Sequence, residues 1–91
     1  MERGRHMERE LTLELKQKLL KMQRDEITGS ILYGKIAERQ KDANNKRVFS
    51  EISRAERGHY ETWRGYTKQD VAPNRRKIAL FSVLSRVLGI T

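Results

Sequence analysis

The sequence predicts an all-α protein made of an antiparallel helical hairpin and a shorter C-terminal helix. Charged residues are 35% of the chain and hydrophobic residues 36%, a balance typical of amphipathic helices. Apolar residues recur at helical spacing along most of the chain, and there is only one proline. With 91 residues the chain forms one small domain that buries a limited share of its surface alone, so self-association would stabilise it.

The first helix is predicted over residues 8–40, after a charged leader at residues 1–7 that is expected to be disordered. Its apolar stripe consists of two series at seven-residue spacing, offset by four: Leu15, Met22, Gly29 and Ile36, with Leu19, Glu26, Tyr33 and Gln40. Glu26 therefore lies on the stripe. Gly29 and Gly34 each cost up to roughly 1 kcal/mol relative to alanine inside a helix, which indicates that another backbone or a site comes close to them.

The second helix is predicted over residues 43–66, after a short turn in which Asp42 serves as the N-cap. Asn44 and Asn45 could instead belong to the turn. The apolar stripe of this helix alternates steps of three and four: Phe49, Ile52, Glu56, His59, Trp63 and Tyr66. A purely structural helix would hold leucine or isoleucine in place of Glu56 and His59. Trp63 and Tyr66 are expected to belong to the core.

The third helix is predicted over residues 73–90, with Pro73 in its first turn, after Gly65 and residues 67–72 have ended the second helix. It is amphipathic through Ile78, Phe81, Leu84, Val87 and Leu88. The apolar run of residues 78–91 is too short, and through Arg86 too charged, to span a bilayer. It would dock on a partner, or the chain is truncated there.

Net charge is +8, which favours a nucleic-acid or anionic-membrane partner. The basic residues are spread along the chain, however, and only Asn74–Lys77 forms a compact cluster, so solvated helix faces are favoured and no nucleic acid is expected. Because cysteine is absent, a metal would have to be held by carboxylates and histidines. The charged N-terminus lacks the apolar segment of a signal peptide, which indicates a cytoplasmic protein.

The two predicted helices would bring their carboxylates together. In an antiparallel hairpin that turns near residue 41, residues whose numbers sum to about 82 lie at the same height. Glu26 then faces Glu56, and Tyr33 faces Phe49. Met22 is likewise paired with Tyr60, and Leu19 with Trp63. Since residues three apart share one helix face, His59 joins the two carboxylates inside an apolar shell.

Burying carboxylates without a counter-charge costs on the order of several kcal/mol, so they need a salt bridge, a proton or a metal ion. A divalent cation such as Fe(II), Mn(II) or Zn(II) suits two carboxylates and an imidazole. One chain supplies three ligands. A two-fold dimer supplies four glutamates and two histidines, the ligand set of carboxylate di-iron bundles. Tyr33 could act as a redox-active or supporting phenol. Alternatively, Glu56 pairs with Arg57 or Lys46 at the surface.

Other ionisable residues lack this context. Three glutamates lie outside the apolar stripes and are expected to face solvent: Glu38, Glu51 and Glu61. A role of some of them in a metal entry path is the less favoured alternative. His6 is expected to be a solvated residue of the leader.

At these residues the chain resembles a known superfamily. The run Asp25-Glu26-Ile27 with Tyr33, together with Ala55-Glu56-Arg57-Gly58-His59, resembles the ferritin-like superfamily, specifically rubrerythrin-related domains. The interval between Glu26 and Glu56 is similar to that of encapsulated ferritins, whose two-helix subunits dimerise to complete a di-iron site. Residues 66–91 resemble the rubrerythrin-like domain ahead of the membrane part in some vacuolar-iron-transporter-family proteins. These resemblances cover roughly residues 15–91.

The resemblance implies a ferroxidase or iron-delivery protein that dimerises into a ferritin-like four-helix bundle. Two irons would be bridged by Glu56 of each chain, with Glu26 and His59 as terminal ligands, and Mn or Zn could substitute. Dioxygen or peroxide would be the oxidant, and an encapsulating shell or a membrane iron-transporter domain a possible partner. A complete rubrerythrin-like domain has four helices and a second Glu-x-x-His, so symmetry must supply the missing half, or the chain is a fragment.

Two alternatives stay open. In the first, the chain is a metal-free basic helical module whose Asn74–Lys77 cluster contacts nucleic acid or an anionic membrane, while Glu26, Glu56 and His59 fix a coiled-coil register. In the second, a bound metal only stabilises the fold.

Overall fold

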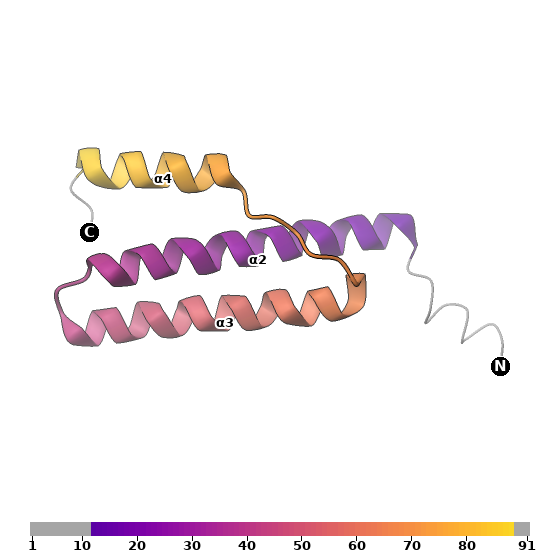
Figure 1. The fold of residues 1–91 in the computed structure, drawn as a ribbon, viewed down its shortest axis with the longest axis horizontal. Helices are drawn as coiled ribbons and strands as arrows, with labels where there is room; N and C mark the ends of the chain where they lie inside the picture. Colours follow the sequence, from indigo (N-terminus) through magenta and orange to yellow (C-terminus); the bar gives the residue numbers. More distant parts are fainter. Residues whose placement is uncertain (1–11, 89–91) are drawn as a thin grey trace.

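The computed structural model describes residues 12–88, which form three helices joined by two loops (Figure 1). Helix α2 spans Leu13–Arg39, α3 spans Ala43–Thr67 and α4 spans Arg75–Leu88. Helices α2 and α3 lie side by side as an antiparallel hairpin, and α4 runs along the other side of α2 in the same direction as α2 (Figure 1). Helix α4 packs on α2 and not on α3. The predicted all-α fold is confirmed.

Helix α2 is capped by Thr12, whose extended backbone precedes the helix and whose Oγ1 accepts a 3.1 Å hydrogen bond from the N–H of Leu15. The described helix therefore begins at Leu13, and residues 8–11 of the predicted helix lie outside the described part of the chain. The leader at residues 1–7 lies outside it as well. At the other end, Gln40 is already extended, so the helix ends one residue earlier than predicted.

The turn between α2 and α3 is as short as the sequence predicts. Asp42 Oδ1 accepts hydrogen bonds from the N–H groups of Asn44, at 2.7 Å, and Asn45, at 3.1 Å. These bonds satisfy N–H groups that have no partner within the helix. Asp42 is thus confirmed as the N-cap, and both asparagines belong to α3 rather than to the turn.

Helix α3 continues through Gly65, which the sequence predicts as a helix end, and stops after Thr67. The left-handed residue that terminates it is Lys68, with φ 60°. The loop that follows is held by an ion pair between Arg64 and Asp70. It is also held by Gln23, whose fully buried side chain donates to the carbonyl of Gln69 at 2.6 Å.

Helix α4 begins later than predicted because Asn74, not Pro73, starts it. Asn74 Oδ1 accepts a 3.0 Å hydrogen bond from the N–H of Lys77, which is the arrangement of an N-cap. The backbone N–H of Asn74 donates a 2.9 Å hydrogen bond to Thr28 Oγ1. This bond to α2 fixes the start of the helix, so Pro73 lies outside it. Residues 89–90 of the predicted helix are outside the described range.

The core of the described chain is thin. Only two apolar residues are buried, Ala37 and Tyr60, at 4% and 7% exposure, and the other buried residues are polar: Gln23, Thr28, Ser30, Thr67 and Ser85. A fold with so little buried apolar surface is marginal by itself.

The predicted register of the hairpin is confirmed by its aromatic pair. The rings of Tyr33 and Phe49 stack with centroids 6.2 Å apart. Trp63 is half-buried, but Tyr66 is 61% exposed, so its predicted place in the core is wrong. Tyr66 lies on the His59 side of α3, two helical turns further on, and nothing within the described chain covers that side.

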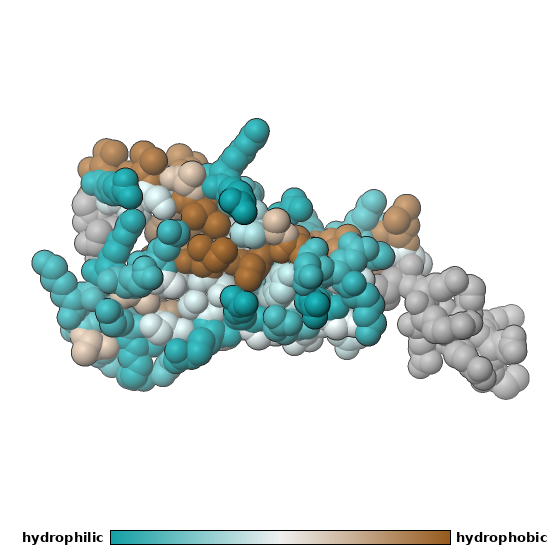
Figure 2. Space-filling view, in the orientation of Figure 1, coloured by the Kyte–Doolittle hydropathy of each residue, from teal (hydrophilic) through white to brown (hydrophobic). Residues whose placement is uncertain are grey.

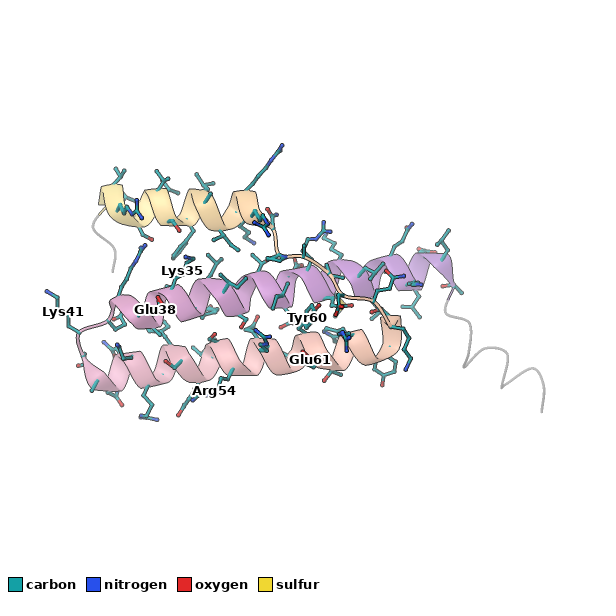
Figure 3. The ribbon with its side chains drawn as sticks, viewed as in Figure 1. Lys35, Glu38, Lys41, Arg54, Tyr60 and Glu61 are labelled. Carbon is teal, nitrogen blue, oxygen red and sulfur yellow. The ribbon has the colours of Figure 1, made fainter. Side chains whose placement is uncertain are left out.

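Polar and apolar residues are distributed unevenly over the helices. Figure 2 shows hydrophilic residues over α3 and hydrophobic ones over α4 and along part of α2, on the face drawn. Figure 3 shows Glu38 and Glu61, with Arg54, on the hairpin in the same view. The three glutamates expected in solvent, Glu38, Glu51 and Glu61, are all exposed. Among residues 12–88, no helix combines the length and apolarity needed to cross a membrane.

Candidate metal centre

Three ionisable side chains converge between α2 and α3. Glu26, Glu56 and His59 each offer one ligand atom, and these atoms lie within 4.8 Å of one another. His59 Nδ1 is 3.1 Å from Glu26 Oε2 and 3.9 Å from Glu56 Oε1. The shorter distance is a hydrogen bond and the longer one is not. The structure therefore brings together the three residues that the sequence predicts as metal ligands.

Helix geometry accounts for this convergence. Glu56 and His59 are three residues apart on α3, so their side chains leave the same face of that helix. Glu26 comes from α2 and reaches this face because the short turn at Asp42 fixes the register of the two helices. Neither helix could assemble the three groups alone.

One turn away from the site, two serines hold the helices together. Ser30 Oγ donates to the carbonyl of Ser53 at 2.9 Å, and Ser53 Oγ donates to the carbonyl of Ser30 at 2.7 Å. Ser30 is four residues after Glu26, and Ser53 is three before Glu56. These serines were not predicted to support the site, although their numbers obey the same pairing rule as the carboxylates.

Gly29 makes room for the carboxylate of Glu56. A Cβ atom at this position would lie 2.7 Å from Glu56 Oε2, closer than two unbonded heavy atoms of this kind can approach. Gly34 is less crowded, with the nearest atom, Ser53 Oγ, at 3.4 Å. The expectation that a site comes close to these glycines is confirmed for Gly29. The missing side chain is thus a feature of the site.

Placing the two carboxylates together has an electrostatic cost. Burial raises the pKa of Glu56 above its ordinary value of 4.5, and the charge of Glu26 and a hydrogen bond with it raise it further. The charge of His59 lowers the pKa of Glu56 and offsets part of this effect. A divalent cation between the carboxylates would relieve the same repulsion.

The site is open on one side. The side chains of Glu26 and Glu56 are 21% and 28% exposed, whereas that of His59 is 58% exposed. The sequence predicts a closed apolar shell around the three groups, and within the single chain this prediction is wrong. Ser30 and Ser53 meet in the α2–α3 contact, whereas Met22 and Tyr66 of the two stripes are exposed.

Three exposed apolar residues lie on the same side of the hairpin as this opening. Along the helices, Met22 lies one turn before Glu26, Leu15 two turns before Met22, and Tyr66 two turns after His59, which places them on the same side as the ligands. Met22 and Leu15 are 41% and 45% exposed. We call this surface the metal face; it comprises Glu26, Glu56 and His59 with Leu15, Met22 and Tyr66.

The remaining predicted residues are not part of the convergent group. Tyr33 is seven residues after Glu26, roughly 10 Å along the helix axis, and its ring stacks on Phe49. Among the described residues, Glu56 lies 3.9 Å from His59 and forms no salt bridge with Arg57 or Lys46. Glu51 pairs with Arg47 on the surface of α3. His6 lies outside the described residues.

The donor set fits a borderline divalent cation. Two carboxylates and one imidazole are ligands that Fe(II), Mn(II) and Zn(II) accept, and three donors leave coordination positions for further ligands. His59 Nδ1 and Glu26 Oε2 are already 3.1 Å apart, and a cation bound by both atoms would replace the hydrogen bond between them. Comparisons with protein-family models, with curated proteins and with solved structures return no match.

Proposed function

We propose that this protein binds iron at a centre shared by two copies of the chain and that the paired centre oxidises Fe(II). The observation that carries the proposal is the convergence of Glu26, Glu56 and His59 at the open metal face. The three residues would supply half of the ligands of a di-iron centre, and the side chain of His59 is exposed on the open side of the group.

The shape of the chain supports the pairing. Helix α4 lies against α2 and not against α3, and the side chain of His59 is 58% exposed, so a second hairpin can reach the ligands from their open side. The exposed apolar residues Leu15, Met22 and Tyr66 would be buried in that contact, which would add the apolar core that one chain lacks. Two hairpins related by a two-fold axis form a four-helix bundle with four glutamates and two histidines at its centre.

The proposed reaction requires little acid-base chemistry from the protein. Two Fe(II) ions each give up one electron, and dioxygen takes both electrons and two protons and leaves as hydrogen peroxide. Glu26, Glu56 and His59 hold the substrate ions, and carboxylate ligands favour the Fe(III) product because hard oxygen donors bind the higher charge more strongly. The apolar groups at the interface exclude water. Tyr33 remains a candidate for a supporting phenol, two turns from Glu26.

The proposal is tested by metal stoichiometry and intact mass. Fe(II) titrated without oxygen should bind at about one ion per chain, in an assembly with an even number of chains. Glu56→Ala and His59→Ala should lose this binding, whereas Glu61→Ala, which removes an exposed carboxylate of the same helix, should keep it. Admission of air should then produce Fe(III) absorbance above that of buffer with iron.

Each outcome separates one part of the proposal. Binding without oxidation would leave a structural metal and contradict the ferroxidase role. Equal binding by Glu56→Ala would contradict the site itself. Met22→Lys, which places a charge on the metal face, should yield monomers that do not bind iron. Leu13→Lys is the control, at an exposed position near the start of α2, and should keep both the dimer and the iron. Monomers that retain the metal would contradict a shared centre.

A further inference from the structure

Helix α4 has two different sides. The side of α4 that faces α2 contains Ile78, Phe81, Ser82 and Ser85, and Ser85 is buried. Away from α2 it exposes five large aliphatic residues, between 46% and 73% exposed: Leu80, Val83, Leu84, Val87 and Leu88. We call these five residues the outer face. Contact with the rest of the chain thus uses the side of α4 that contains two serines.

The outer face has the spacing of a helix that lies against an apolar phase. Its residues follow the steps i, i+3, i+4, i+7 and i+8, which form one stripe along a helix. Figure 2 shows hydrophobic residues along the edge of the molecule that α4 forms. Only two apolar residues are buried among residues 12–88, whereas five large aliphatic residues are exposed on this one helix. We therefore expect another surface to cover the outer face.

The charges of α4 indicate what kind of occupant it is. The helix contains Arg75, Arg76, Lys77 and Arg86 and no acidic residue. The three cations of the first turn stand at the positive end of the helix dipole, where an acidic residue would be favoured. They lower the stability of the helix in water, and an anionic surface placed against them would remove that cost.

We propose that α4 is an interfacial helix that lies on an anionic lipid bilayer, with its outer face in the acyl boundary and its basic residues among the headgroups. An aliphatic stripe combined with basic residues is the combination that such helices use. Arg76 and Lys77 lie one turn before Leu80, on the same side of the helix as the outer face, and lipid phosphates attract cations close to the surface. At fourteen residues the helix lies on the bilayer and does not cross it.

Other occupants fit less well. A second copy of α4 would bring four more cations and no acidic residue to the contact, so the two helices would repel each other. The phosphates of nucleic acid would pair with the basic residues, but this binding would leave the five exposed aliphatic residues without a contact. An anionic lipid surface uses both properties of the helix. The proposal does not depend on the metal centre, which lies on the α2–α3 hairpin.

The test is co-sedimentation of the full chain with two kinds of vesicle, phosphatidylcholine alone and phosphatidylcholine with an equal amount of phosphatidylglycerol. The protein should sediment with the anionic vesicles and not with the neutral ones, and added salt should weaken binding. The double variant Leu80→Ser with Val87→Ser should lose binding. Leu13→Ser is the matched control because Leu13 and Val87 are equally exposed, at 73%.

The basic cluster is tested in the same assay. Replacing Arg75, Arg76 and Lys77 by glutamine removes three cations, each worth about a fivefold change in partition, so binding should fall on the order of 100-fold. The control carries the same change of charge at exposed positions of the hairpin: Lys41, Lys46 and Arg54, each to glutamine. That control should bind nearly as the parent does.

Several results would overturn the proposal. Equal loss in the two charge variants would show that net charge, and not α4, governs binding. Binding to neutral vesicles as strong as to anionic ones would remove the role of the cations. Tight binding to duplex DNA that survives the Leu80→Ser and Val87→Ser changes, without vesicle binding, would assign the helix to nucleic acid. A fall in oligomer mass caused by those serines would assign the outer face to a second copy.

Discussion

The α2–α3 hairpin and α4 use their apolar residues in different ways. The hairpin joins its helices through small and polar groups, such as Ser30 with Ser53, and places ionisable residues at the edge of that contact. Helix α4 attaches to α2 through Ile78, Phe81 and two serines and leaves its aliphatic stripe outside. The comparison teaches that the two regions differ in where their contacts lie: the hairpin contact brings Glu26, Glu56 and His59 together within the chain, and the outer face of α4 is exposed to solvent.

The largest expected difference between the two regions is in stability. Gln23 is fully buried, donates to the carbonyl of Gln69 and accepts from Thr67 Oγ1 at 2.7 Å. Gln23→Ala should lower the free energy of unfolding by about 2–4 kcal/mol, because it leaves a cavity and removes both hydrogen bonds of the buried Gln23 side chain. Val83→Ser on the outer face should change it by less than about 0.5 kcal/mol. Urea denaturation followed by circular dichroism measures both.

Similar losses in these two variants would break the comparison, because they would mean that the outer face of α4 is buried in solution. The expected result would show that the hairpin carries the stability of the chain and that Val83 contributes little to it.

A smaller effect separates two glycines within the hairpin. Gly29→Ala should reduce metal affinity about 10-fold or more, because its Cβ would displace the carboxylate of Glu56, and ligand displacements of this kind cost 10–100-fold. Gly58→Ala should leave metal affinity unchanged, since nothing lies within 4 Å of a Cβ there. Both should keep or raise helix stability, by up to about 1 kcal/mol. Competition with a chelator measures the affinity, and thermal unfolding measures the stability.

This pair distinguishes a site from a packing contact. Should Gly29→Ala bind metal as the parent does, the close approach of Glu56 would have no role in the centre. Should both variants lose affinity alike, the cause would lie in the helices and not in the space beside Gly29.

The smallest expected effect concerns pH. Because folding raises the pKa of Glu56, the folded chain favours the protonated form of this carboxyl. Its stabilising contribution is fully present below the ordinary value of 4.5 and is lost as the pH rises through the raised pKa. In metal-free protein, Glu56→Gln should match the parent at low pH and exceed its stability at neutral pH by roughly 0.2–0.5 kcal/mol, the size of a like-charge pair on helices.

Denaturation midpoints measured across this pH range test the prediction. Glu61→Gln is the control, since it removes an exposed carboxylate of the same helix. An equal gain in Glu61→Gln would assign the effect to the net charge of the chain and not to the pair of Glu26 and Glu56. At neutral pH Glu56→Gln should also lose the metal, so that stability and binding change in opposite directions.

The helices and the three ligands were predictable because they depend on local geometry. The spacing of apolar residues determines a helix, and the three-residue step places Glu56 and His59 on one face. Asp42 is recognisable as an N-cap from its side chain alone, and a short turn fixes the register that brings Glu26 to the same height. These features follow from residues close to one another in the sequence or from simple pairing across a turn.

What the sequence by itself determined is therefore the number of helices, the hairpin and the identity of the convergent residues. Only the tertiary structure decided which sides of the helices are covered. Asn74 starts α4 because Thr28 on another helix accepts its N–H, Tyr66 is exposed because the described chain has nothing to cover it, and Leu84 faces away from α2 while Phe81 faces it. The physical reason is that an amphipathic pattern fixes the spacing of a stripe, whereas its burial depends on contacts with residues far away in the sequence.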